Sequence, residues 1–299
     1  MNYLQYIIDN VSERNVFAAK KLKKSLKQVD ADHESSANLY FEKYFAYLKN
    51  KGIDYDYANT CYLKLLNDML EQRAKFLETG KYANTSYKQV EKSIYSNPQI
   101  MDYHMHGLAI AQFTWPEQYA RYRFFKDNLL NYSPINNYLE IGGGHCLYAW
   151  TAYEKLDKKI IPDIIDISES SLNIVKGILG EKNANYIHMD VFDFNSINKY
   201  DFITCGEVIE HVENPVAMLK QFRSLLADNG TVFISTPINA PMIDHIYLFS
   251  NENEIRELFG EAGFIVAKDV SVCSENVDAR IAEELKLPVM YAAFLKKKL

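Results

Sequence analysis

Two acidic residues and a histidine lie close together in the run GEVIEH, as Glu207, Glu210 and His211. At spacings of three and four residues, their side chains share one face of a helical turn. A further pair, Asp244-His245, follows the next β-rich run. Carboxylates and imidazoles can bind a divalent ion such as Mg²⁺, so Glu207, Glu210, His211 and His245 are candidate metal ligands. The alternative is that they brace a loop, with His211 as a general base whose ordinary pKa lies near neutrality and Glu210 as a further catalytic candidate.

A glycine-rich turn precedes this cluster. Gly142, Gly143 and Gly144 are three of only 12 glycines, and they follow an apolar run that contains Glu140. A turn without Cβ atoms lets the backbone approach a ligand, and the start of the next helix offers free amides. By itself this signal is weak, because a tight turn alone would also explain it.

An acidic residue ends the next β-rich run, where Asp166 comes 22 residues after Gly144. A carboxylate at about this distance accepts hydrogen bonds from the hydroxyls of a nucleoside ribose. Asp166 could instead serve the following helix, but Ser168 is the better N-cap. The combination therefore predicts a nucleoside-binding site.

Short β-rich runs alternate with amphipathic helical segments after about residue 131, which predicts an α/β fold with a mostly parallel sheet covered on both faces. The expected strands are 138–141, 159–166, 185–189, 201–205, 230–236, 263–270 and 288–295, and the expected helices are 147–156, 169–179, 215–226 and 252–262. An antiparallel arrangement of the last two strands stays open. Ligands bind outside the carboxyl ends of such strands, where the residues named above fall.

Residues 1–130 show apolar positions at helical spacing, so they predict an all-α domain that covers the site or mediates a homodimer, ahead of a cofactor-binding domain at 131–299. In the aromatic segment 95–116, Tyr103, His106 and Gln112 are candidate lid or substrate contacts, the first two with a catalytic role. Packing between helices is an equally good explanation for them.

From about residue 131 onward the chain resembles the class I S-adenosylmethionine-dependent methyltransferases, in the subgroup of the ubiquinone-biosynthesis enzymes. The glycine turn, Asp166, the run ending in Asp190-Val191 and the run GEVIEHVENP carry the resemblance. It implies a Rossmann-like seven-stranded sheet and S-adenosylmethionine as the cofactor. Cys146 departs from the pattern, since the family has a third turn glycine there.

The resemblance also implies roles for matching positions. The turn, with Glu140, Gly142, Gly143 and Gly144, would surround the amino-acid part of the cofactor. Asp166 with Ile167 would hold the ribose, and Asp190 with Val191 would contact adenine. Glu207 would line the floor below the methionine end. Similar ExxEH runs bind a divalent ion in ubiquinone O-methyltransferases and, with an added histidine, in terminal-ribose methyltransferases of small RNAs.

The expected reaction is in-line methyl transfer to an oxygen or nitrogen of a small-molecule acceptor, with specialised metabolites as one class of acceptor. Ribose 2′-O-methylation of RNA and a non-catalytic cofactor-binding protein are the alternatives, and another use of the cofactor, such as a cyclisation, is also open. A dinucleotide-dependent dehydrogenase is disfavoured, because GEVIEHVENP has no role in hydride transfer.

The amino-acid composition also bears on the class of protein and on its partners. The 299 residues are 48% hydrophobic and 24% charged, as in ordinary globular proteins, and no run reaches the roughly 18 apolar residues of a membrane span. The start lacks a basic signal region and the four cysteines form no CxxC pair, so we expect a cytoplasmic protein with reduced thiols and no membrane partner. Residues 132–299 hold 15 Lys and Arg against 24 Asp and Glu, which argues against a nucleic-acid partner.

Overall fold

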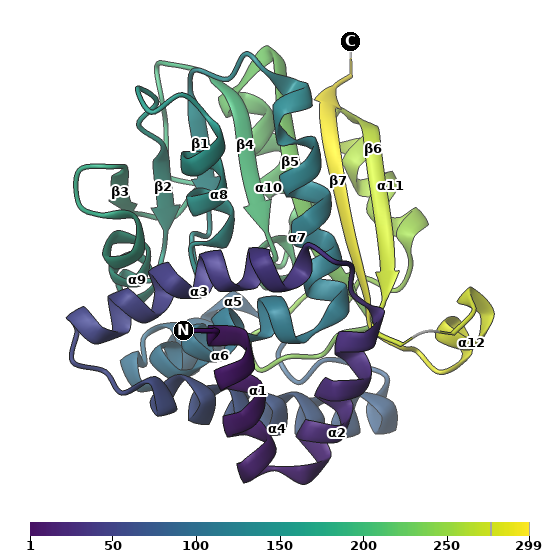
Figure 1. The fold of residues 1–299 in the computed structure, drawn as a ribbon. Coiled ribbons are helices and arrows are strands. Elements are labelled where there is room, and N and C mark those ends of the chain that lie inside the picture. The colour runs from purple at the N-terminus through teal and green to yellow at the C-terminus, as the bar shows by residue number, and fades with distance from the viewer. Residues whose placement is uncertain (276, 299) are drawn as a thin grey trace.

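A seven-stranded sheet forms the centre of the protein (Figure 1). The computed structural model describes residues 1–275 and 277–298. The strands lie in the order β3-β2-β1-β4-β5-β7-β6. Their bounds are β1 Tyr138–Ile141, β2 Asp163–Asp166, β3 Asn185–His188, β4 Tyr200–Gly206, β5 Leu226–Ile238, β6 Phe264–Cys273 and β7 Val289–Lys297.

The first five strands are parallel, and β7 runs antiparallel to both of its neighbours. Leu139 pairs with Asp163 and with Ile203 in the parallel part, whereas Ile234 pairs with Ala293 across the antiparallel β5–β7 ladder. The α/β prediction is therefore confirmed, and the open question at the last two strands is resolved in favour of an antiparallel arrangement. β2 begins later than predicted, after Pro162, which has no amide proton to give to a ladder.

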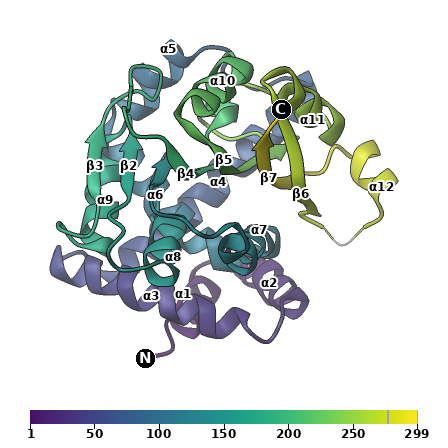
Figure 2. The same ribbon diagram turned by 90° about the horizontal axis from the view of Figure 1, so that it is seen from above.

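Helices cover both faces of the sheet (Figure 2). One face carries α7 (Pro116–Asn128), α8 (Leu147–Lys155) and α9 (Glu169–Leu179), and the other carries α10 (Pro215–Leu225) and α11 (Glu252–Glu261). Leu219 and Phe222 of α10 pack on Ile203 and Ile234, so this face has a core of its own. A short helix, α12 (Ala279–Glu284), precedes β7.

The remaining helices lie below the carboxyl ends of the parallel strands in Figure 1. They are α1 Tyr3–Arg14, α2 Val16–Ser25, α3 His33–Asn50, α4 Tyr55–Thr79, α5 Tyr87–Val90 and α6 Pro98–Thr114. Their aromatic interior, which includes Tyr40, Phe41 and Phe113, is continuous with the core under β4, β5 and β7. The predicted division between residues 130 and 131 therefore does not coincide with a break in packing.

No helix among the described residues has both the length and the apolarity required to cross a bilayer.

Candidate active site

A cavity of about 640 Å³ separates the carboxyl edge of the sheet from the helices below it. Most of the predicted site residues line it: Gly142, Gly144, Asp166, Ile167, Asp190, Val191, Glu207, His211 and His245, together with Gln112. The predicted residues that do not line it are Glu140, Gly143, Glu210, Tyr103 and His106. The motifs recognised in the sequence thus converge on one site.

The glycine turn after β1 needs backbone conformations that side chains disfavour. Gly142 has φ of +76°, and a Cβ there would lie 2.4 Å from Cγ2 of Val208. Gly144 has φ of +44° and faces the cavity. Cys146 adopts φ of +71° without being a glycine, at a cost of about 1 kcal/mol. The departure from the family pattern therefore leaves the turn intact.

Asp166, at the end of β2, presents its carboxylate to the cavity. Its Oδ1 accepts a hydrogen bond from the Ser168 amide at 2.8 Å and its Oδ2 accepts one from the Gly144 amide at 3.4 Å. Burial raises the pKa of Asp166 to about 6, against the effect of these amides. Ser168 caps α9, as predicted, since its side chain accepts from the Ser171 amide. The acid and the turn together fit the ribose and adjoining atoms of a nucleoside.

Two residues of the predicted glycine turn, Glu140 and Gly143, do not face the cavity. Glu140 is 2% exposed and accepts a hydrogen bond from the Tyr138 hydroxyl at 2.9 Å. Burial raises the pKa of Glu140 to about 8. Gly143 packs against Ile164 and Val175. Glu140 is therefore buried beside Tyr138, and Gly143 lies against the packed residues of β2 and α9 instead of facing the cavity.

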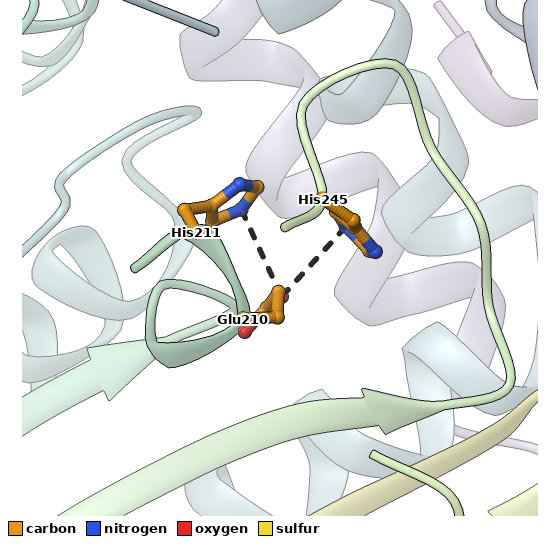
Figure 3. A group of neighbouring side chains, drawn as sticks. All are labelled: Glu210, His211 and His245. Atoms are coloured by element: carbon orange, nitrogen blue, oxygen red, sulfur yellow. Dashed lines mark ion pairs between the residues drawn. The ribbon is translucent and has the colours of Figure 1, made fainter. Parts of the chain in front are cut away.

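Glu210 lies beneath the cavity and joins two histidines (Figure 3). Its Oε1 is 3.8 Å from Nε2 of His211 and 3.9 Å from Nε2 of His245. The Thr236 hydroxyl donates to its Oε2 at 3.0 Å. Burial, aided by the nearby Glu207, raises the pKa of Glu210 to about 8. Glu210 is fully buried, so it positions the histidines rather than contacting a substrate.

His211 is held between two backbone carbonyls. Its Nδ1 lies 3.0 Å from the Asp244 carbonyl oxygen and its Nε2 lies 3.1 Å from the Glu207 carbonyl oxygen. A carbonyl only accepts, so both bonds require both ring nitrogens to be protonated. Burial lowers the pKa of His211, but the Asp244 and Glu210 carboxylates outweigh it and hold this pKa above its ordinary value. The two carbonyl contacts and the neighbouring carboxylates thus favour the protonated form of His211.

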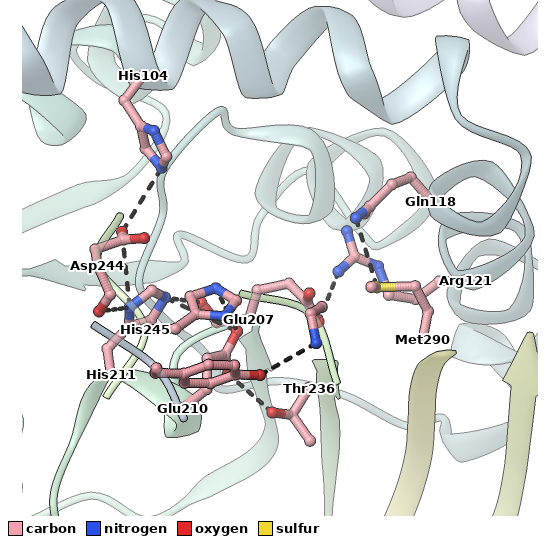
Figure 4. Close-up of polar contacts among 12 residues, drawn as sticks. His104, Gln118, Arg121, Glu207, Glu210, His211, Thr236, Asp244, His245 and Met290 are labelled. Atoms are coloured by element: carbon pink, nitrogen blue, oxygen red, sulfur yellow. Dashed lines mark hydrogen bonds and ion pairs between the residues drawn. The ribbon is translucent and has the colours of Figure 1, made fainter. Parts of the chain in front are cut away.

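Asp244 bridges the sheet side and the helical side of the cavity (Figure 4). Its Oδ2 is 3.7 Å from Nδ1 of His211 and 3.6 Å from Nε2 of His104 on α6. Burial raises the pKa of Asp244, yet His211 and His104 outweigh it and hold this pKa below its ordinary value. Burial lowers the pKa of His104. The sequence prediction did not choose His104 or assign Asp244 a role, although Asp244 stands beside the predicted His245.

Tyr103 and His106 were wrong choices for cavity contacts. The Tyr103 hydroxyl donates to Asp68 on α4 at 2.8 Å. His106 is fully buried, with its Nδ1 2.7 Å from the Tyr44 hydroxyl. Both side chains fill interfaces between helices, which was the alternative explanation. His104 faces the cavity because residues two apart on a helix point in different directions.

Glu207 is paired with an arginine that the sequence did not single out. Nη1 of Arg121, on α7, lies 2.7 Å from Oε1 of Glu207 (Figure 4). Burial lowers the pKa of Arg121, but Glu207 outweighs it and keeps the guanidinium charged. Glu207 has φ of +57° and stands outside the short 3₁₀ turn Ile209–His211, so the shared helical face predicted for the acids and the histidine does not form.

Three of the four predicted metal ligands lie close together, and Glu207 does not join them. Donor atoms of Glu210, His211 and His245 lie within 4.8 Å of one another, while Glu207 is engaged by Arg121. Both ring nitrogens of His211 face carbonyl oxygens, so neither has a lone pair free for an ion in this arrangement. These residues do not fit a divalent ion as they stand, and no step of the chemistry is assigned to one.

Comparison with known proteins identifies the domain. A family model described as a methyltransferase domain matches residues 117–268, about half of the chain. The ubiquinone biosynthesis O-methyltransferase of Coxiella burnetii (strain Dugway 5J108-111) is 33% identical over 86 residues, which are 28% of this chain and 36% of that protein. Malonyl-(acyl-carrier protein) O-methyltransferase 2 of Ilyobacter polytropus is 30% identical over 103 residues, 34% of this chain and 39% of that protein. The chain thus matches little more than a third of the length of these relatives.

Solved structures share the fold. The N-methyltransferase NodS from Bradyrhizobium japonicum WM9, in complex with S-adenosylhomocysteine, superposes with a TM-score of 0.53 at 13% identity, over 67% of this chain and 97% of that one. The mitomycin 7-O-methyltransferase MmcR gives a TM-score of 0.53 at 11% identity, over 77% and 67% of the two chains.

Proposed function

Because the chain belongs to the methyltransferase-domain family and is an S-adenosylmethionine-dependent enzyme, we propose that it methylates a hydroxyl oxygen of a small-molecule acceptor. The cavity of about 640 Å³ is of the size that small ligands occupy, which supports a small molecule over RNA. The names of both curated relatives, which are O-methyltransferases, favour oxygen over nitrogen.

The cofactor half of the site lies along β2, β1 and β4. Asp166 would accept hydrogen bonds from the ribose hydroxyls, and the turn at Gly142 and Gly144 would allow the amino-acid part to approach the backbone. When bound, the cofactor supplies a methyl group on a positively charged sulfur, which is already activated for transfer. The residues around it have to align the acceptor and exclude water.

The observation that carries the proposal is the placement of His211 on the cavity wall beside the Asp244 carboxylate. In its neutral form His211 can take the proton of the acceptor hydroxyl while that oxygen forms its bond to the methyl carbon and the carbon–sulfur bond breaks. Nε2 is the nitrogen suited to this, because its partner, the Glu207 carbonyl oxygen, lies at the cofactor half. The acceptor hydroxyl would replace that carbonyl as the partner of Nε2, while Nδ1 keeps its hydrogen bond to the Asp244 carbonyl oxygen. Asp244 then stabilises the imidazolium.

The test is replacement of His211 by Asn with S-adenosylhomocysteine release as the readout over a panel of phenols and amines. We expect methyl transfer to a hydroxyl to fall about 10²- to 10⁴-fold, with unchanged binding of S-adenosylhomocysteine. His188→Asn is the matched control, because His188 lies at the exposed end of β3 and does not line the cavity. Its Nε2 is 2.9 Å from the Ile167 carbonyl oxygen, so S-adenosylhomocysteine affinity is measured for this variant as well. Full activity of the His211 variant, or turnover of amines only, would refute the proposal.

A further inference from the structure

The cavity extends well beyond the cofactor half. Asp166 stands at the end of β2, whereas Pro288 and Met290 at the start of β7 and Glu275 after β6 line the opposite end of the same cavity. Three strand spacings separate β4 from β6 in the sheet, which is about 14 Å. This part of the cavity, beyond Glu207, is called the distal half here.

Apolar side chains dominate the walls of the distal half. Leu22 comes from α2, Tyr62 and Leu66 come from α4, and Trp115 comes from the junction of α6 and α7. Met290 closes the sheet side. Such a lining binds the body of a ligand through its apolar surface and gives little direction to it.

One buried side-chain amide, that of Gln118, can orient a ligand in the distal half. Gln118 is 5% exposed and lines the distal half, and its Nε2 is 3.5 Å from the Met290 sulfur. Its Oε1 is buried and has no hydrogen-bond partner among the described residues. A buried carbonyl without a partner is costly, so a ligand group that donates to it would be favoured. A hydroxyl meets this need whichever way the amide is turned.

The charges of the distal half favour a neutral ligand. Arg73 is engaged by the carbonyl oxygens of Asn239 and Leu285, at 3.3 and 2.9 Å. Lys21 and Glu275 also line the cavity, and so does the buried Glu117, whose pKa is raised to about 7 by burial. Two basic and two acidic side chains therefore lie on these walls in the described part of the chain, so neither sign is in excess and a neutral ligand is favoured.

We propose that the distal half is an acceptor subsite for a neutral, elongated molecule whose apolar body lies between α2, α4 and β7 and whose far end offers a hydroxyl to Gln118. This rests on the proposed function, because it places the methylated hydroxyl beside His211 and the rest of the acceptor along the sheet edge.

Binding of a homologous series to the protein saturated with S-adenosylhomocysteine tests the subsite without turnover. Calorimetry on para-methyl-, para-butyl- and para-hexylphenol should show affinity rising roughly threefold to fourfold per methylene. Leu66→Trp, which fills the distal half, should abolish this gain and leave S-adenosylhomocysteine affinity unchanged. Leu77→Trp is the control, because Leu77 lies on the same helix, is 58% exposed and does not line the cavity. Affinity independent of chain length, or a gain that Leu66→Trp leaves intact, would overturn the subsite.

A second series tests the group at the far end. The para-(ω-hydroxyhexyl)phenol should lose about fivefold in affinity in Gln118→Leu, while para-hexylphenol should not. Equal effects on both probes would overturn the role of Gln118. Tighter binding of the ω-carboxylate analogue than of the hydroxyl compound would overturn the inference of a neutral ligand.

Failure of the proposed function can be distinguished from failure of the proposed subsite. If the phenols bind with the expected chain-length dependence but are not methylated, the chemistry assigned to His211 is wrong and the subsite stands. If a phenol is methylated without any dependence of binding on chain length, the function stands and the subsite is wrong.

Discussion

Nη1 of Arg121 lies 2.7 Å from Oε1 of Glu207, which joins the helix that covers one face of the sheet to the residue at the end of β4. Arg121 is 1% exposed, and its Nη2 also donates to Oε1 of Gln112 on α6 at 2.9 Å. This charged link stands at the boundary between the cofactor half and the distal half of the cavity. It therefore fixes a carboxylate that would otherwise be free to turn toward either ligand.

Breaking this pair should destabilise the protein. Arg121→Met leaves the Glu207 carboxylate without its cation, and we expect the free energy of unfolding to fall by about 3 kcal/mol, measured by urea denaturation. The double variant with Glu207→Gln should recover much of the loss, since no uncompensated charge remains. Arg123→Met, at an exposed arginine of the same helix, is the control. Additive effects of the two substitutions would contradict the pairing.

Asp166→Asn should weaken S-adenosylhomocysteine binding roughly 10- to 100-fold, because hydrogen bonds from the ribose hydroxyls to a charged acceptor are lost. Calorimetry measures this directly. Asp193→Asn, at an exposed aspartate just beyond β3 that does not line the cavity, should bind like the unaltered protein. Unchanged affinity in Asp166→Asn would remove the basis for the cofactor site.

The pH dependence of that affinity follows from the same carboxyl. The pKa of Asp166 is raised to about 6 by burial, so lowering the pH through this value protonates the group and removes a charged acceptor. Binding of S-adenosylhomocysteine should thus weaken as the pH falls below about 6, with proton release on binding near that pH. Titrations in two buffers of different ionisation enthalpy measure the proton release, and Asp166→Asn should abolish it. A pH-independent affinity in the unaltered protein would show that Asp166 does not hold the ribose.

The rate of methyl transfer should depend on pH through His211. The transfer needs the neutral imidazole, and the pKa of His211 is held above its ordinary value because Asp244 and Glu210 outweigh burial. The rate should therefore rise with pH and level off above that pKa. In Asp244→Asn the pKa falls, so the rise should move to lower pH while the plateau drops, because the imidazolium is less stabilised. A profile that does not move would assign the ionisation to another group.

Most of the sheet could be predicted because each strand is a short apolar run bounded by turn residues. The range 138–141 was predicted to the residue for β1, and 169–179 for α9. The greater length of β5 was missed at its start, because Ala227, Asp228 and Asn229 carry no apolar pattern. They extend along β4 through a register shift that only the paired strands reveal.

The cofactor side of the site was predictable for a similar reason, since its residues directly follow strands whose ends meet at one edge. The helical side was not. α6 is buried on almost every side, so its sequence does not show which face meets the cavity, and Tyr103 and His106 were chosen instead of His104. The ion pair between Arg121 and Glu207 joins residues far apart in the chain, so no local sequence pattern indicates it.

The aromatic contacts of α7 bear on how such an enzyme could be re-engineered. Phe124 packs against Phe294 of β7 and Phe125 packs against Phe233 of β5, with ring centroids 5.2 and 4.8 Å apart and the rings tilted. A fragment beginning at residue 131 would lack Phe124 and Phe125 and would expose Phe294 and Phe233 to water, whereas a chimera joined between Trp115 and Pro116 would retain all four rings. Replacing the residues before that junction is thus the simplest way to change the acceptor preference while the part that binds the methyl donor stays unchanged.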